Sequence, residues 1–284
     1  MLSAGRRVAT GSRPQESSSE APAVDEVKQS MLDRLDTLTS DAPVSEEQKQ
    51  LSLQCFRYYF RYLLEALPTT PSRQWTVLEA GVGMCGWSHL FGQFFDTVYG
   101  ADIEDYSEYH PGVKFITADL TQGIPLPDQS VDLVVCYSVL EHVLDVPAAL
   151  ANFDRVLKVA GHLHLTVDPL YYSAQGSHIY GPKPFENWEH LDPRCERYLL
   201  GNPLPDADTQ GHVLNKMTYS DFLAWVGRFP WLILRSQTTI DPRPVPDYVD
   251  RGRWSEMDLR TRGFNLVARK EWHFAGADRR LAAA

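Results

Sequence analysis

Residues 77–88 read VLEAGVGMCGWS, an apolar run that passes into a glycine-rich segment. Gly81, Gly83 and Gly86 match the G-x-G-x-x-G spacing, in which a strand ends in a tight turn and a helix begins. Such a turn lets a ligand approach the backbone closely, so the stretch predicts a nucleotide-binding loop. Glu79 does not suit a dinucleotide, because its carboxylate would face the pyrophosphate across a partly dry crevice.

The sequence on both sides of this loop predicts an α/β fold with a parallel sheet. Short apolar runs alternate with stretches of helical periodicity from Trp75 onward, as expected for strands joined by crossover helices. Helices are expected at 45–67, where the aromatic stripe forms either core or a pocket wall, and also over 87–95 and 147–157. The expected strands are 75–79, 97–101, 113–117, 131–137, 162–167, 231–240 and 264–270.

Three regions are expected along the chain. Residues 1–23, rich in Ser, Pro, Ala and Glu, predict a disordered tail, and a transit peptide is the alternative because the first fifteen residues contain no acid. Residues 24–73 predict N-terminal helices that cover the active site, and residues 74–284 predict the main domain. Within that domain residues 168–216 are irregular and rich in Pro, Gly and aromatic residues, which favours a lid.

The composition argues against several classes of partner. The formal net charge is −10 and basic residues cluster only between Arg251 and Arg262, so no nucleic-acid partner is expected. No apolar run approaches the ~20 residues of a membrane span, so no membrane partner is expected. The four cysteines are far apart, which argues against disulfides or a zinc site and favours a cytoplasmic location.

Acidic residues lie at or just after the ends of three successive expected strands and indicate what the loop binds. Glu79 would stabilise a ligand that carries an ammonium and a sulfonium group, and S-adenosylmethionine carries both. Asp102 lies 21 residues after Gly81, a spacing that suits the ribose hydroxyls of any adenosine cofactor. Asp119 follows the third strand, where it can accept a hydrogen bond from an adenine amino group. These three acids favour S-adenosylmethionine over NAD.

Five segments together resemble one enzyme family. VLEAGVG, GADI, ADL, VDLVVCYSVLEHV and LKVAGHL are similar, in order and spacing, to motifs of class I S-adenosylmethionine-dependent methyltransferases, and most similar to the small-molecule, family-11 type. The resemblance covers about residues 75–168. It implies a Rossmann-like, seven-stranded, mostly parallel sheet with helices on both faces, an irregular lid after the fifth strand and a terminal antiparallel hairpin. It also implies methyl transfer to a small-molecule acceptor, preferentially at a hydroxyl.

The resemblance assigns cofactor contacts to eight residues of this sequence. The methionyl and methyl end would be held by Glu79, Gly81, Gly83 and Tyr137. The adenosine end would be held by Asp102, Ile103, Asp119 and Leu120.

Two positions depart from the family pattern. The third glycine is usually found where this chain has Cys85, and here it arrives one residue later as Gly86. The related quinone O-methyltransferases carry a metal-binding E-x-x-E-H motif, whereas this chain has Ser138 in place of the first acid. No metal is therefore expected.

The lid region supplies the candidate substrate and catalytic residues. Aromatic residues and histidines there could enclose a small acceptor, and the candidates for binding it are Tyr171, Tyr172, Trp188 and His190. His178 is the first candidate for the general base and His142 the second, because a histidine pKa lies near the operating pH. The alternative for each histidine is a structural role.

Two other functions remain open at the level of sequence. One is an NAD(P)-dependent oxidoreductase, against which Glu79 and Asp119 argue. The other is a methyltransferase-like binding protein without turnover.

Overall fold

The computed structural model describes residues 24–178, 187–192, 194 and 214–272. The tail expected at 1–23 and a large part of the expected lid lie outside these residues.

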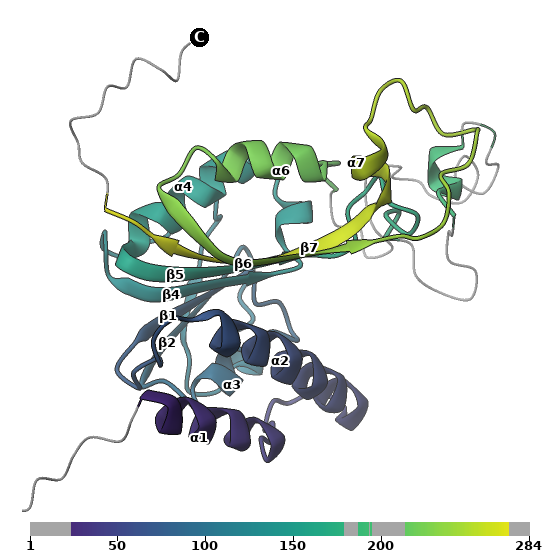
Figure 1. The fold of residues 1–284 in the computed structure, drawn as a ribbon. Helices are drawn as coiled ribbons and strands as arrows, with labels where there is room; N and C mark the ends of the chain where they lie inside the picture. The colour runs from purple at the N-terminus through teal and green to yellow at the C-terminus, as the bar shows by residue number, and fades with distance from the viewer. Residues whose placement is uncertain (1–23, 179–186, 193, 195–213, 273–284) are drawn as a thin grey trace, which may run out of the picture.

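A single seven-stranded sheet forms the centre of the molecule, with strand order β3-β2-β1-β4-β5-β7-β6 (Figure 1). Pairing is parallel from β3 through β5, and β7 runs antiparallel to both β5 and β6. The strands are β1 Thr76–Ala80, β2 Thr97–Asp102, β3 Lys114–Thr117, β4 Val131–Tyr137, β5 Leu157–Val167, β6 Trp231–Ile240 and β7 Thr261–Lys270. The predicted mostly parallel α/β sheet with its antiparallel hairpin is confirmed. The strand order reverses between β1 and β4, which is where such sheets bind ligands.

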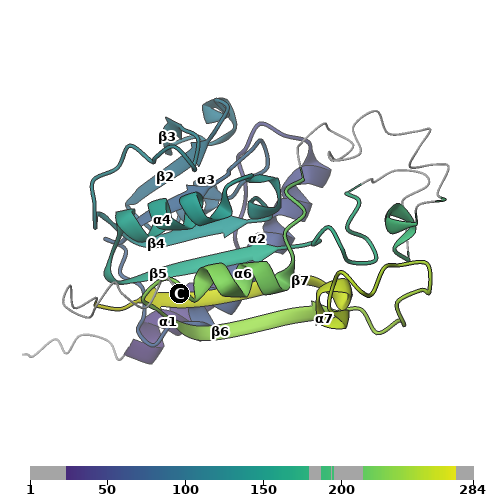
Figure 2. The ribbon, with the colours of Figure 1, turned by 90° about the horizontal axis from the view of Figure 1, so that it is seen from above.

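Helices cover both faces of the sheet, as predicted. Helices α1 (Val24–Asp36), α2 (Glu46–Ala66) and α3 (Ser88–Phe91) lie on one face, and α4 (Val146–Val156) and α6 (Tyr219–Val226) lie on the other (Figures 1 and 2). Each face has its own apolar core, built around Phe56, Phe60 and Phe91 on the α2 side and around Phe153 and Phe222 on the α4 side. Helix α2 begins with a full capping box at Ser45 and Gln48.

Two elements differ most from their predicted bounds. Strand β5 starts at Leu157, five residues before the predicted 162, because α4 ends there and the chain enters the strand without a loop. The helix expected over 87–95 is a single turn, Ser88–Phe91, and the residues after it form turns. Leu90, Phe91, Phe94 and Phe95 are nevertheless buried. Their helix-like spacing therefore reflects burial in the core and not a continuous helix.

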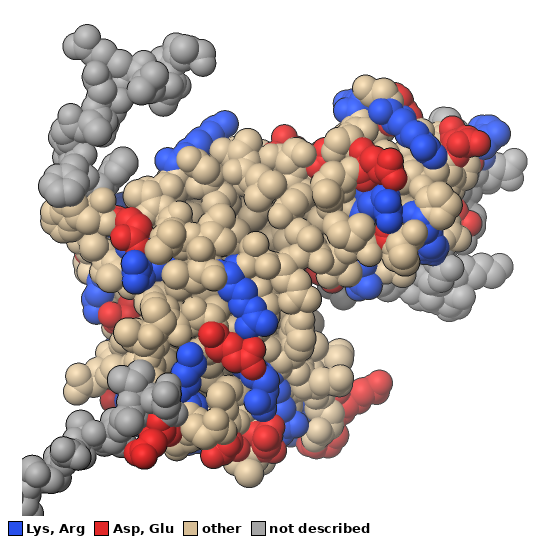
Figure 3. Space-filling view, viewed as in Figure 1, with Lys and Arg blue, Asp and Glu red and all other residues tan. Residues whose placement is uncertain are grey.

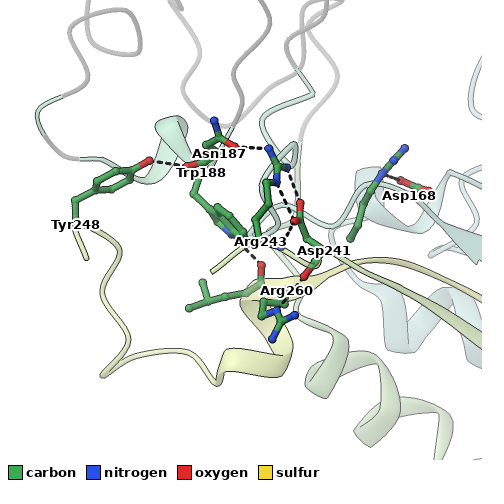
Figure 4. A network of polar contacts seen from close by, with 9 residues as sticks. Asp168, Asn187, Trp188, Asp241, Arg243, Tyr248 and Arg260 are labelled. Atoms are coloured by element: carbon green, nitrogen blue, oxygen red, sulfur yellow. Dashed lines mark hydrogen bonds and ion pairs between the residues drawn. The ribbon is translucent and has the colours of Figure 1, made fainter. Parts of the chain in front are cut away.

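A small third cluster connects the insertion to the loop between β6 and β7. Trp188 packs with Val245, Val249 and Leu259 beside the short helix α7 (Glu256–Arg260). The indole N–H of Trp188 donates to the carbonyl of Leu259 at 2.8 Å. Arg243 pairs with Asp241 at 2.6 Å and also reaches Asn187 (Figure 4). These contacts place a lobe beyond the carboxyl ends of the central strands (Figure 1).

Candidate active site

The glycine loop follows β1, and each of its three glycines is in a different steric environment. Gly81 has φ +79°, and a Cβ there would lie 2.3 Å from the Val139 side chain. Gly83 has φ +50°, and no atom of the described residues lies within 4 Å of a Cβ added there. A Cβ on Gly86 would lie 2.2 Å from the carbonyl oxygen of Val82. The loop therefore needs its third glycine at 86, whereas Cys85 is exposed and is not among the residues with positive φ.

Glu79 is buried beneath this loop, at 3% exposure. Its two carboxylate oxygens accept hydrogen bonds from the Trp87 backbone N–H, both at 2.9 Å, and one accepts from the Ser88 hydroxyl at 2.5 Å. The carboxylate thus occupies the amino end of α3, where a dinucleotide fold would bind its pyrophosphate. Burial raises the pKa of Glu79 to about 7, although the hydrogen bonds from Ser88 and Trp87 act in the opposite direction.

Asp102 ends β2 and faces the same loop. One carboxylate oxygen accepts from the Gly83 backbone N–H at 2.9 Å and the other accepts from Glu104 N–H at 3.3 Å. Ile103, the next residue, is an apolar side chain left 68% exposed. A carboxylate with a fixed orientation beside an uncovered apolar surface suits a ribose and the base attached to it.

Asp119 and Leu120 follow β3 at the same edge of the sheet. One oxygen of Asp119 accepts from both the backbone N–H and the hydroxyl of Thr121, each at 2.8 Å. Its second oxygen has no hydrogen-bond partner among the described residues. The Leu120 carbonyl accepts from Asn152 of α4 at 2.9 Å, which holds this loop against the helix.

Tyr137 ends β4 and is held by a buried chain of hydrogen bonds. Its hydroxyl lies 2.8 Å from Nδ1 of His164, and Nε2 of His164 lies 2.6 Å from the Asn265 side-chain oxygen. Because an amide oxygen only accepts, His164 carries its proton on Nε2 and accepts from Tyr137. Burial lowers the pKa of His164 to about 3, which keeps the ring neutral.

Tyr59 of α2 packs against Tyr137, and the sequence identified it only as part of an aromatic stripe. Its ring stacks on Trp87 at 5.7 Å and on Tyr137 at 5.5 Å between centroids. Burial, followed by the charge of Asp168, raises the pKa of Tyr59 to about 12. Of the two roles open to the stripe, Phe56 and Phe60 form core, and a role of Tyr59 in a pocket wall stays a prediction.

The two histidines considered as bases lie next to each other beyond β4 and β5. The ring centroids of His142 and His178 are 5.3 Å apart and the rings meet edge to face. His178 donates through Nε2 to the Pro169 carbonyl at 2.7 Å. Glu141 lies directly before His142, is 4% exposed, and has its pKa raised to about 8 by burial.

The four predicted substrate residues lie in the lobe and pack against its own chain. Trp188 is 1% exposed, and His190 donates to the Tyr171 carbonyl at 2.6 Å. Tyr172 packs on Trp254, with ring centroids 4.4 Å apart. These contacts give each residue a structural role, and a role in acceptor binding stays a prediction.

Surface charge, possible metal ligands and helix length bear on which partners the protein can bind. On the face shown in Figure 3, basic and acidic side chains are interspersed without a continuous basic surface. Among the described residues, no three His, Cys, Asp or Glu side chains are placed to hold a metal ion. Within the same residues, no helix is long and apolar enough to cross a bilayer.

Comparison with known proteins gives matches over the part of the chain that contains the glycine loop. Residues 78–165 match a family profile described as "Methyltransferase domain". A probable S-adenosylmethionine-dependent methyltransferase from Mycolicibacterium smegmatis is 34% identical over 89 residues, which are 30% of this chain and 35% of that protein. A ubiquinone/menaquinone biosynthesis C-methyltransferase, UbiE, from Shewanella sp. (strain ANA-3) is 30% identical over 127 residues, 40% of this chain and 49% of that protein. The matches thus span between a third and a half of these relatives.

Solved structures share the fold at low sequence identity. A protein from Listeria monocytogenes, described as an S-adenosylmethionine-dependent methyltransferase, aligns with TM-score 0.50 and 17% identity over 75% of this chain and 97% of its own. A sarcosine dimethylglycine methyltransferase structure from Galdieria sulphuraria aligns with TM-score 0.50 and 12% identity, over 87% of this chain and 99% of its own. At these identities the likeness concerns the fold alone.

Proposed function

Because residues 78–165 belong to the class I S-adenosylmethionine-dependent methyltransferases, we propose that this chain transfers a methyl group from S-adenosylmethionine to a small-molecule acceptor. The observation that carries the proposal is the Glu79 carboxylate at the amino end of α3. It repels the phosphates of a dinucleotide and attracts an ammonium or sulfonium group. Gly83, open on its exposed side, leaves room for a ligand to approach the loop.

The proposed cofactor contacts follow the carboxyl ends of four adjacent strands. Glu79 at β1 and Tyr137 at β4 would hold the methionyl end, with Gly81 and Gly83 allowing close approach. At the other end, Asp102 would accept from the ribose hydroxyls and Ile103 would pack on the adenine, while Asp119 and Leu120 would contact the adenine edge. The second oxygen of Asp119, which has no hydrogen-bond partner among the described residues, is consistent with that role.

We further propose that the acceptor atom is a hydroxyl oxygen. S-adenosylmethionine supplies an electrophilic methyl carbon, so an oxygen–carbon bond forms as the carbon–sulfur bond breaks and a thioether leaves. The hydroxyl proton must pass to a base, for which His178 is the first candidate and His142 the second. Most of the rate enhancement would come from alignment, which Tyr59 and Tyr137 could provide as a rigid wall. Transfer to carbon, the reaction that the name of UbiE gives, is the alternative.

Two other functions predict different binding. An NAD(P)-dependent oxidoreductase would need the amino end of α3 for its pyrophosphate, and Glu79 fills that position. A methyltransferase-like binding protein would bind the cofactor without turnover, so only an assay of transfer separates it from an enzyme.

Ligand binding tests the proposal directly. We expect S-adenosylmethionine and its demethylated product to stabilise the protein against thermal unfolding, by about 2.7 kcal/mol at ~100 times the dissociation constant. NAD at the same concentration should have no effect. Stabilisation by NAD alone would favour the oxidoreductase. Incubation with labelled S-adenosylmethionine and a panel of phenols, quinols and amines, with the methyl position read by NMR, then distinguishes oxygen from carbon and nitrogen.

The proposal that His178 is the general base can be tested by substitution. His178→Gln keeps a donor for the Pro169 carbonyl but removes the base, so we expect kcat to fall by about 10²-fold or more while cofactor affinity is unchanged. His142→Gln is the matched comparison and should have a smaller effect on kcat. Equal losses would assign the role to neither histidine alone, and an unchanged pH profile of kcat in His178→Gln would rule out His178.

A further inference from the structure

His110, in the segment between β2 and β3, contacts the glycine loop. It follows the 3₁₀ turn Ser107–Tyr109 between β2 and β3, and its side chain is 2% exposed. Its Nε2 lies 2.8 Å from the carbonyl oxygen of Gly83. From sequence, a histidine before a proline would be placed in an ordinary loop. In the structure this histidine reaches a residue 27 positions earlier in the chain.

The protonation state of His110 is set by this contact and by burial. A carbonyl oxygen only accepts, so Nε2 carries the proton and donates. Burial lowers the pKa of His110, which keeps the ring neutral. The charged and titratable neighbours are His89 of α3, whose ring centroid lies 5.9 Å away, and Asp102 of β2. Burial also lowers the pKa of His89, to about 4, so neither imidazole is charged near neutral pH.

Hydrogen bonds hold the loop at both the N–H and the carbonyl of Gly83. The Gly83 N–H donates to Asp102 at 2.9 Å, and the Gly83 carbonyl accepts from His110 at 2.8 Å. The remaining side of Gly83 is open, because within the described part of the chain nothing lies within 4 Å of an added Cβ. The same bond from Gly83 also fixes the carboxylate of Asp102. The orientation of the loop therefore depends on Gly83, and so does that of Asp102, the proposed hydrogen-bond acceptor for the ribose.

We propose that His110 is a positioning residue for cofactor binding: it fixes the Gly83 peptide, and through it Asp102, without touching the cofactor. The proposal rests on the proposed function, because it concerns the same cofactor site. A neutral donor suits this position, since a lysine or arginine would add a charge beside the cationic cofactor. Because His110 binds the backbone of the loop and not the cofactor, we expect it to act on affinity and not on the methyl-transfer step.

The test compares donor-bearing and donor-less replacements by calorimetric titration with S-adenosylmethionine. His110→Phe keeps a ring but no donor, and His110→Met fills the space flexibly. We expect both to raise the dissociation constant about tenfold, the usual worth of one hydrogen bond. His110→Gln keeps an N–H and should stay within about threefold of the parent. In an assay of turnover, KM for the cofactor should rise while kcat holds.

A matched control separates loop positioning from the general cost of losing a buried histidine. His162 is also buried, at 4% exposure, and neither of its ring nitrogens has a partner among the described residues. His162→Phe should leave the dissociation constant unchanged. Parental affinity in folded His110→Phe or His110→Met, or an equal loss in His110→Gln, would overturn the proposal. If the parent protein itself failed to bind S-adenosylmethionine, the proposed function would fail instead.

Discussion

Gly86→Ala is expected to destabilise the protein by about 3 kcal/mol and to abolish cofactor binding. The added Cβ would lie 2.2 Å from the Val82 carbonyl oxygen and within 3 Å of two further backbone atoms, so the loop itself must move. A loss of this size is a large fraction of the 5–15 kcal/mol that stabilises a typical domain. Urea unfolding monitored by circular dichroism measures the change.

Gly83→Ala is the matched control, because it separates loss of fold from loss of binding. None of the residues that the structure describes comes within 4 Å of a Cβ at this position, and its φ of +50° costs about 1 kcal/mol for alanine. The variant should therefore fold. Its methyl group nevertheless enters the open side of the loop, so we expect affinity for S-adenosylmethionine to fall at least tenfold. A Gly86→Ala protein as stable as the parent would contradict the close approach to Val82.

The glycine loop shows how far the sequence could be interpreted. Its spacing predicted a strand, a turn and a helix, and the acids Glu79, Asp102 and Asp119 predicted a cationic adenosine ligand. The sequence could not explain why Cys85 replaces the expected third glycine. That answer depends on the position of the Val82 carbonyl relative to residue 86, a backbone contact that no residue pattern encodes.

Residues distant in sequence were the ones that pattern analysis missed. His110 and Tyr59 contact the loop through tertiary packing, and neither lies in a motif with fixed spacing to Gly83 or Trp87. Periodicity placed Tyr59 on a buried helix face but could not choose between core and wall. In the insertion, composition predicted an aromatic lid, but it could not foresee that Trp188 packs into a separate core with Leu259.

Titration of buried groups should give the stability of the cofactor-free protein a maximum near pH 6.5. Above that pH, Glu79 and Glu141 ionise in the folded state at about 7 and about 8, and in the unfolded state near 4.3. The folded state then holds protons that the unfolded state has lost, so stability falls as pH rises to about 8. Below pH 6.5 the direction reverses, because the unfolded state protonates histidines that burial keeps neutral in the fold, namely His89, His162, His164 and His190.

Affinity for S-adenosylmethionine should rise with pH, both below pH 6.5, where stability also rises, and just above it, where stability falls. The cationic cofactor binds the ionised form of Glu79, so protonation competes with binding at every pH below about 7. We expect the dissociation constant to improve about tenfold between pH 5.5 and 7, a range below the titration of the ligand's own amine. Calorimetric titration at several pH values measures this.

Glu79→Gln attributes both effects to one carboxyl. The amide can still accept from Trp87 and donate to Ser88, so the loop should keep its conformation. Without a charge to lose, the variant should bind weakly at every pH and show a flat profile from pH 5.5 to 7. It should also lose less stability than the parent between pH 6.5 and 8, since only Glu141 still ionises there. A parental pH profile in Glu79→Gln would show that another group controls binding, and the cation-binding role of Glu79 would have to be abandoned.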